Sequence, residues 1–121
     1  MAVNIIDITD DLMTVKFSGT LAHAELVTLQ FSIARLMSEM GMIRFLGILE
    51  NFQGWAKDGN WGDISFESEH DTGMEKMALV GDRKWEELVR IFTGQGARPF
   101  PIRYFLPEEM NEARRWLAEP A

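Results

Sequence analysis

A short and almost wholly apolar run, Met42–Leu49, is the feature that most restricts how this chain folds. Apolar residues precede it at spacings of three and four, which indicates one face of a helix of roughly five turns. These residues are Leu26, Leu29, Ile33, Leu36, Met37 and Met40. Gly41 follows them, where a glycine commonly ends a helix. A short strand that is apolar on both faces and follows a helix is typical of a parallel sheet covered by helices. The run therefore predicts an α/β fold.

Two further strands are predicted before this helix. Residues 3–9 are rich in β-branched and apolar side chains, and residues 12–17 alternate between two faces. Asp10 and Asp11 lie between these segments, and a connection of two residues predicts an antiparallel hairpin. The sequence Ser18-Gly19-Thr20 is interpreted as the break that ends the second strand.

The rest of the chain continues the alternation of strands and helices. The predicted elements are a Gly-rich loop over 50–62, a short acidic helix over 61–72, a strand over 77–80, a helix capped by Asp82 and ended by Gly94, a strand over 102–105 and a helix that begins at Pro107. Pro99 and Pro101 favour an edge position for the last strand. The order β-β-α-β-α-β-α-β-α predicts a mixed, mostly parallel sheet of about five strands, covered by about four helices. We expect one domain over residues 1–121.

Composition excludes several classes of function. The 121 residues include no cysteine, which excludes disulfides and cysteine-ligated metals. The formal net charge of −7 repels phosphate backbones, so no nucleic-acid partner is expected. The N-terminus lacks the pattern of a signal peptide, and no apolar stretch is long enough to span a bilayer. A cytoplasmic location is therefore expected.

No catalytic motif is recognisable, and neither a metal nor a cofactor is predicted. The glycine patterns of phosphate loops and dinucleotide sites are absent, and so is the nucleophile elbow of hydrolases. A small enzyme would have to use His23 or His70 as its base, because the chain has two histidines. Glu67 and His70, with Asp63 and Asp71, leave a cation site open as an alternative to a solvated acidic helix face.

Aromatic side chains are the most informative candidates for a site. Phe52, Trp55, Trp61 and Phe66 gather in an acidic segment punctuated by glycines, and loops that follow strands are where open α/β sheets bind ligands. Such rings line an apolar pocket, form a mobile lid or partner surface, or simply anchor a long loop. Thr20 and His23 join them as candidates at the start of the first long helix, where free N–H groups suit a polar head group. Trp85, Phe92 and Trp116 are interpreted as core, since each fits the apolar face of its helix.

Several strings resemble a known family in the order in which they occur. They are Phe52-Gln53-Gly54-Trp55, Met77-Ala78-Leu79-Val80-Gly81-Asp82 with Trp85, Arg103-Tyr104-Phe105, Glu112-Ala113-Arg114 and Trp116-Leu117. Together they resemble the SpoIIAA-like family of small bacterial proteins with a STAS-type domain, over essentially the whole chain. The resemblance implies a five-stranded sheet wound with its helices as a β/α superhelix.

The same resemblance implies a regulatory or binding role. Relatives with STAS domains act as anti-sigma-factor antagonists and are switched by phosphorylation of a serine after the third strand. Here that place reads Glu50-Asn51-Phe52-Gln53-Gly54-Trp55, which contains neither serine nor threonine. The fold is also similar to lipid-carrying CRAL-TRIO domains, which implies an apolar ligand or contact with a membrane.

Three functions are therefore considered, in this order. The first is a non-enzymatic module that binds a small apolar or lipid-like molecule between the first long helix and residues 52–66, with peripheral membrane contact as an extension. The second is a STAS-type regulatory module that binds a protein partner, and the third is a small enzyme that uses His23 or His70. A homodimer is a further expectation, since the apolar edge strand with its prolines and the aromatic rings of residues 52–66 offer surface for it.

Overall fold

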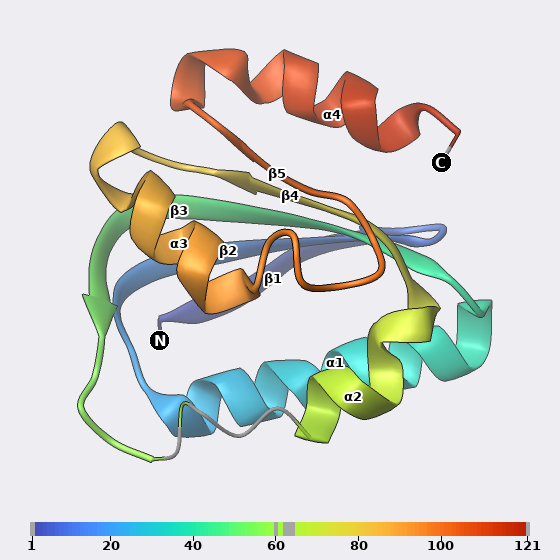
Figure 1. Cartoon of the computed structure of the whole chain (residues 1–121), viewed down its shortest axis with the longest axis horizontal. Coiled ribbons are helices and arrows are strands. Elements are labelled where there is room, and N and C mark those ends of the chain that lie inside the picture. The colour runs from blue at the N-terminus through green and yellow to red at the C-terminus, as the bar shows by residue number, and fades with distance from the viewer. Residues whose placement is uncertain (1, 60, 62–64, 121) are drawn as a thin grey trace.

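The computed structural model describes residues 2–59, 61 and 65–120. Its strands and helices are β1 (Val3–Thr9), β2 (Leu12–Leu21), α1 (His23–Met40), β3 (Ile43–Trp55), α2 (Ser65–His70), β4 (Met74–Val80), α3 (Glu86–Thr93), β5 (Ile102–Phe105) and α4 (Met110–Ala118), with short 3-10 helices over Asp71–Gly73, Arg83–Trp85 and Pro107–Glu109. The strands form one sheet in the order β1-β2-β3-β4-β5 (Figure 1). The pair β1–β2 is antiparallel and the other pairs are parallel. The predicted α/β fold is confirmed, including the edge position of β5.

The first hairpin forms as its local sequence predicts. Thr9 pairs with Leu12, so that two residues make the turn, and Asp10 adopts a left-handed φ of 54° there. Aspartate tolerates this conformation better than most residues because its short side chain bonds locally. Met13 and Val15 lie on one face of β2 and are fully buried, which fixes the register of the hairpin.

Two predicted boundaries are wrong, because β2 and β3 are longer than their apolar runs. β2 continues through Ser18-Gly19-Thr20 to Leu21, and β3 continues to Trp55 instead of ending near Leu49. The parallel register shifts on either side of Gly19, which adopts a φ of 67°. A glycine inside a strand often marks such an irregularity, since it accepts a backbone conformation that other residues avoid. The ladder therefore continues past residues that read locally as a break.

Helices cover the two faces of the sheet unequally. α1, α2 and α3 lie on one face, and α4 alone lies on the other (Figure 1). The larger core cluster lies under the first three helices and includes Met13, Val15, Leu29, Ile33, Phe45, Leu79 and Val89. The smaller cluster joins α4 to the sheet through Leu46, Ala78, Val80, Phe105, Ala113 and Leu117. Among the described residues, no helix is both long and apolar enough to cross a bilayer.

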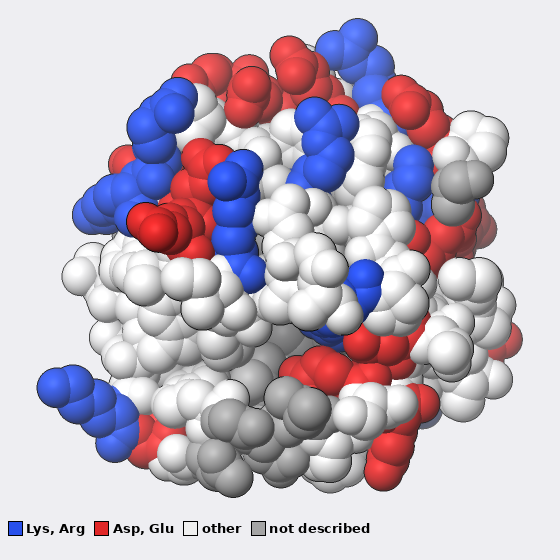
Figure 2. Space-filling model, in the orientation of Figure 1, with Lys and Arg blue, Asp and Glu red and all other residues white. Residues whose placement is uncertain are grey.

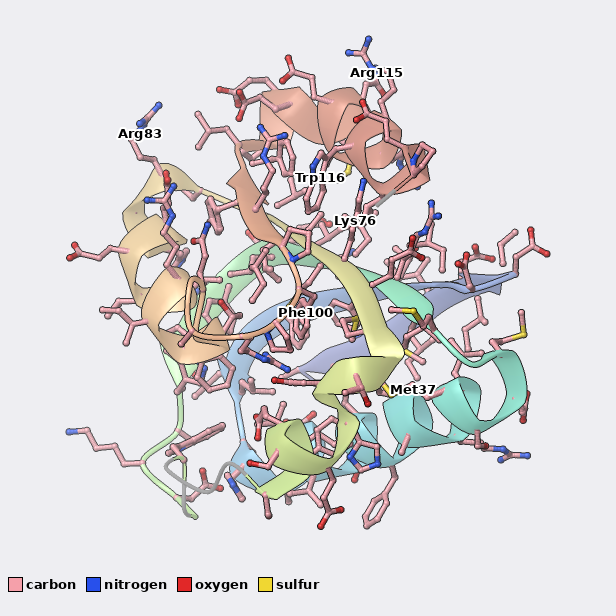
Figure 3. The ribbon with its side chains drawn as sticks, turned by 45° about the vertical axis from the view of Figure 1, so that its right-hand side comes forward. Met37, Lys76, Arg83, Phe100, Arg115 and Trp116 are labelled. Carbon is pink, nitrogen blue, oxygen red and sulfur yellow. The ribbon has the colours of Figure 1, made fainter. Side chains whose placement is uncertain are left out.

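Two cations attach the end of α4 to the sheet. The buried Lys76 of β4 donates from Nζ to the carbonyl oxygens of Trp116 at 2.7 Å and of Glu119 at 2.9 Å, and it lies below Trp116 in Figure 3. Arg44 of β3 donates to the carbonyl oxygen of Leu117. The last carbonyl groups of a helix lack partners within the helix and carry partial negative charge, so cations stabilise them.

Candidate ligand cavity

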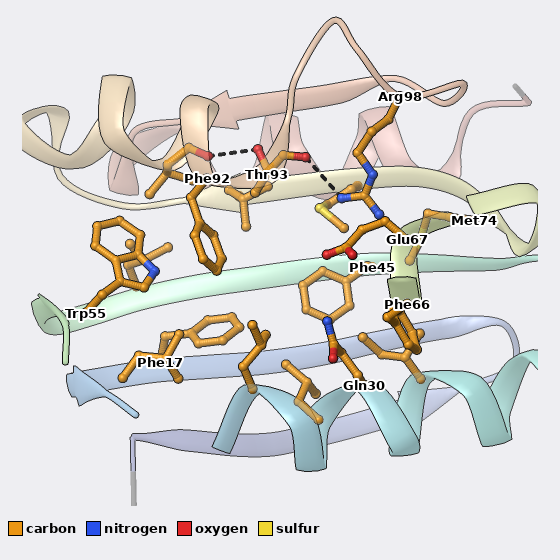
Figure 4. Close-up of a pocket in the computed structure, with 18 of the residues that line it drawn as sticks. Phe17, Gln30, Phe45, Trp55, Phe66, Glu67, Met74, Phe92, Thr93 and Arg98 are labelled. Atoms are coloured by element: carbon orange, nitrogen blue, oxygen red, sulfur yellow. Dashed lines mark hydrogen bonds between the residues drawn. The ribbon is translucent and has the colours of Figure 1, made fainter. Parts of the chain in front are cut away.

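An apolar cavity of about 110 Å³ lies between the sheet and α1, α2 and α3 (Figure 4). Its lining comes from every layer on this side of the protein: Phe17, Leu21, Leu26, Leu29, Gln30, Ile33, Phe45, Leu49, Phe52, Trp55, Phe66, Glu67, Met74, Met77, Leu79, Val89, Phe92, Thr93 and Arg98. Protein interiors are normally closely packed, and here the packing leaves an apolar gap that opens partly to solvent. The cavity therefore distinguishes this core from an ordinary one.

The floor of the cavity depends on a glycine at the centre of β3. A Cβ atom on Gly47 would lie 2.7 Å from Cδ1 of Leu79, 3.1 Å from Phe45 and 3.2 Å from Phe17. All three of these neighbours line the cavity. The absence of a side chain at Gly47 thus lets two aromatic rings and a leucine lie close to the sheet.

One end of the cavity is a cluster of aromatic rings. Phe52 meets Trp55 and Trp85 edge to face, with centroids 5.2 and 5.0 Å apart, and Trp55 lies 5.2 Å from Phe92. These separations lie within the range that favours aromatic pairs. Phe52, which is buried, and Trp55 belong to the extended part of β3, whereas Trp85 and Phe92 come from the segment that begins at Arg83.

Three of the six predicted ligand-binding residues line the cavity and three do not. Phe52, Trp55 and Phe66 contribute to the lining. The ring of His23 meets Trp61 edge to face at 4.9 Å, and Trp61 donates from Nε1 to the carbonyl oxygen of Ala56 at 2.9 Å. The backbone N–H of His23 is 3.2 Å from a carboxylate oxygen of Asp58.

Thr20 is exposed on β2, where it pairs with Gly54. At the start of α1, the carboxylate of Asp58 accepts the hydrogen bond from the His23 N–H. Neither Ser18 nor Thr20 is the N-cap of this helix, because that position is Ala22.

Sequence reasoning missed Phe92 and Glu67 as cavity residues. Phe92 was predicted to be core, but its exposed fraction is 39%, and its ring stands between Trp55 and the rest of the cavity (Figure 4). That prediction is wrong because α3 turns one edge of its apolar face toward the cavity and another toward the surface. The sequence pairs Glu67 with His70 in a Glu-x-x-His pattern, and no local signal indicates that Glu67 points inward.

Two polar atoms in the lining are buried without a hydrogen-bond partner among the described residues. They are Nε1 of Trp55 and Oε2 of Glu67. Figure 4 places them on opposite sides of the Phe92 ring. Arg98 also lines the cavity, but its guanidinium group donates to Asp71, at 2.6 Å for the shortest contact, and to the carbonyl oxygen of Thr93 at 3.0 Å.

His70 and Asp71, two of the residues considered for a cation site, contact other residues in the structure. His70 stacks on Phe66 with ring centroids 4.2 Å apart, and its Nδ1 is 2.9 Å from the Phe66 carbonyl oxygen. Asp71 pairs with Arg98, and Asp63 lies outside the described residues. Within the part of the chain that the structure describes, no three histidine, aspartate or glutamate side chains gather to hold a metal ion.

These features define a small α/β protein with an apolar cavity between one face of its sheet and the helices that cover it. The sequence model of the SpoIIAA-like family matches residues 12–118. The chain therefore belongs to the SpoIIAA-like family, and the resemblance noted in its sequence is confirmed. No curated protein matches the chain.

Solved structures agree with this assignment of the fold. An uncharacterised protein of the DUF3478 family with a SpoIIAA-like fold, from Shewanella loihica PV-4, is similar with a TM-score of 0.69 and 20% identity, over 97% of this chain and 93% of that one. The anti-sigma factor antagonist SpoIIAA in its unphosphorylated form is similar with a TM-score of 0.60 and 14% identity, over 98% of this chain and 100% of that one.

Proposed function

We propose that this protein is a non-enzymatic module that binds a small apolar molecule in the cavity between its sheet and α1–α3. The observation that carries the proposal is the cavity itself, about 110 Å³ in volume and lined mostly by aromatic and aliphatic side chains. The cavity is partly open to solvent, so apolar side chains of its lining remain in contact with water. A molecule that fills the cavity would remove that apolar surface from water.

The volume limits the part of a ligand that the cavity holds. An engineered apolar cavity of about 150 Å³ binds benzene and stays free of water. A single ring or a short alkyl chain is therefore the size of group that this cavity accommodates, and a longer lipid-like molecule would extend beyond it. Several aromatic faces in the lining, among them Phe17, Phe45 and Phe92, favour a planar apolar group.

Ethylbenzene is a suitable first probe, and a larger side chain in the lining tests where it binds. Leu26 is half-buried on α1 and lines the cavity, so Leu26→Trp should fill part of it. We expect ethylbenzene to raise the melting temperature of the wild-type protein, because a ligand that binds only the folded state stabilises it. The Leu26→Trp variant should lose at least about tenfold in affinity.

The matched control is Phe31→Trp, which changes an aromatic ring on the same helix at a position with an exposed fraction of 72%. It should bind ethylbenzene as the wild type does. Equal binding by the Leu26→Trp variant and the wild type would contradict the proposed cavity. Native mass spectrometry of gently purified protein provides a second measurement, since a retained molecule would be released and identified on denaturation, and the same spectrum separates monomer from dimer.

A second candidate function is a regulatory module that binds a protein partner. Membership of the SpoIIAA-like family and the likeness to an anti-sigma factor antagonist support it. So does the outer face of α3, where Leu88 and Ile91 have exposed fractions of 49% and 71%. On this side of the molecule, Figure 2 shows uncharged surface next to charged side chains. Phosphorylation as in STAS relatives has no acceptor between Glu50 and Trp55, a segment that belongs to β3.

A pull-down that compares the wild type with Ile91→Ser tests this second candidate. A partner that the wild type captures and the variant loses would support it. Equal capture by the two proteins would count against α3 as the binding surface. Flotation with lipid vesicles in the same series of measurements tests peripheral membrane contact.

A further inference from the structure

The polar atoms in the cavity narrow the class of ligand, if the cavity binds one as proposed above. Oε2 of Glu67 and Nε1 of Trp55 are the two buried side-chain polar atoms that lack a hydrogen-bond partner among the described residues, and both belong to the lining of the same cavity. Buried polar groups in folded proteins nearly always have partners, because an unpaired group has lost its hydrogen bonds to water without replacement. A ligand with matching groups would satisfy both.

The two groups have opposite requirements. The indole N–H of Trp55 is a donor and needs an acceptor on the ligand, whereas the Glu67 carboxyl group needs a donor. They lie on opposite sides of Phe92 in Figure 4, with apolar walls between them. A ligand that meets both therefore has an apolar middle and two different polar ends.

The charges on the wall favour a cation or a neutral donor over an anion. Among the described residues of the lining, Arg98 is the one basic side chain, and its guanidinium group is already bound to Asp71 and to the Thr93 carbonyl group. The lining therefore holds a guanidinium group that is already paired and a buried Glu67 carboxyl oxygen without a partner among the described residues. Aromatic faces near Glu67, such as Phe66 and Phe45 (Figure 4), would also attract an ammonium group through cation–π interaction.

We propose that the ligand is a small apolar amine or alcohol, with its hydroxyl or amino group on Glu67 and a hydrogen-bond acceptor on the indole N–H of Trp55. Its apolar middle fills the space beside Phe92. The same geometry disfavours a carboxylate, such as the head group of a fatty acid, because that group would place a second carboxyl group beside Glu67.

A series of ligands with one ring in common tests this assignment. Ethylbenzene, phenethyl alcohol, phenethylamine and phenylacetate differ mainly in the polar group at the end of a short chain, and para-methoxyphenethylamine adds an acceptor at the other end. Titration calorimetry gives the affinities, and the indole N–H resonance of Trp55, assigned with Trp55→Phe, reports on that hydrogen bond by NMR. We expect phenethylamine and phenethyl alcohol to bind roughly tenfold or more tightly than phenylacetate.

The substitution Glu67→Gln should weaken the binding of phenethylamine by roughly tenfold, because an ammonium group forms a stronger hydrogen bond with a carboxylate than with an amide. Glu69→Gln is the matched control, since Glu69 is exposed on the same helix. It should leave all affinities unchanged. The added methoxy group should increase the affinity and shift the Trp55 indole resonance downfield. That gain in affinity should disappear in Trp55→Phe.

The outcomes separate the two proposals. Equal binding of ethylbenzene, phenethylamine and phenylacetate, or an amine preference that survives Glu67→Gln, would overturn the assignment of the polar ends and leave the apolar cavity in place. Tighter binding of phenylacetate than of phenethylamine would overturn it as well. Failure of every compound, ethylbenzene included, to bind the wild type would overturn the proposed function itself.

Discussion

The environment of Tyr104 on β5 makes the stability of the folded protein depend on pH. Its hydroxyl group donates to the carbonyl oxygen of Asp82 at 2.7 Å. Burial, together with the nearby charges of Glu86 and Asp82, raises the pKa of Tyr104 from 10.0 to about 12. The phenolate would lose solvation and meet two carboxylates, so the folded state favours the protonated form.

The raised pKa predicts a loss of stability at high pH. Tyr104 holds its proton more tightly when folded, so its contribution is complete below pH 10.0 and is lost as the pH rises toward about 12. We expect the free energy of unfolding of the wild type to fall more steeply over this window than that of Tyr104→Phe. Urea unfolding at several pH values measures the difference, since other groups titrate in both proteins.

Because Tyr104 is the only tyrosine in the chain, tyrosinate absorbance follows its titration directly. A midpoint close to pH 10.0 in the folded protein would refute the proposed environment of Tyr104. Sequence reasoning placed this residue on the last strand but gave no reason to expect the shift. The groups that cause it are more than a dozen residues away along the chain, and only the pairing of β4 with β5 brings them to Tyr104.

At the scale of elements, the extension of β3 brings Phe52 and Trp55 to the cavity. The extension pairs with the end of β2, and the Ala56 N–H donates to the Leu21 carbonyl oxygen at 2.9 Å just beyond it. Gly54 lies within this segment with a φ of 103°, and a Cβ atom there would be 3.4 Å from the Trp85 ring. Side chains are rarely compatible with that backbone conformation.

The substitution Gly54→Ala should therefore destabilise the protein by about 1–3 kcal/mol. Gly19→Ala is the matched comparison, because Gly19 has a φ of 67° and a Cβ atom there would meet nothing within 4 Å. It should cost about 1 kcal/mol, near the lower end of that range. Hydrogen exchange adds a local measurement: the Ala56 amide should exchange faster in Gly54→Ala. Equal stability losses in the two variants would show that a side chain at the φ of 103° costs no more than one at the φ of 67°.

The elements themselves could be predicted because each has a local signal. The spacing of Leu29, Ile33 and Leu36 indicates a helix, and the alternation of Met13 and Val15 indicates a strand. The ends of β2 and β3 could not be predicted in the same way. Gly19 and Gly54 carry the local signal of a break, and only the hydrogen bonds between the two strands keep them in the sheet.

At the scale of the whole molecule, α4 alone covers one face of the sheet, and Lys76 connects the two layers. The Lys76 Nζ atom donates to two carbonyl oxygens at the end of α4 and lies 4.9 Å from the centre of the Trp116 ring. A buried cation with such partners is stable, but its removal leaves the carbonyl groups without a donor.

Lys76→Met should consequently destabilise the protein by about 1–3 kcal/mol, and loss of order should begin at α4. Lys57→Met is the control, since Lys57 is exposed and the same change there should alter stability by less than about 0.5 kcal/mol. Urea unfolding followed by Trp116 fluorescence, in a background where Trp55, Trp61 and Trp85 are phenylalanine, would report on this layer. A Lys76→Met variant as stable as its parent would show that apolar packing alone holds α4.

The sequence alone determined the order of the elements, the antiparallel hairpin, the edge position of β5 and the family, because periodicity and turn residues are local properties of the chain. It also directed attention to Phe52, Trp55 and Phe66. Only the tertiary structure decided that these rings share a cavity with Phe92 and Glu67, and that Thr20, His23 and Trp61 lie outside its lining. The physical reason is that a cavity, an unpaired buried atom or a cation beneath a helix end depends on neighbours distant in sequence, which only the packing of helices on the sheet brings together.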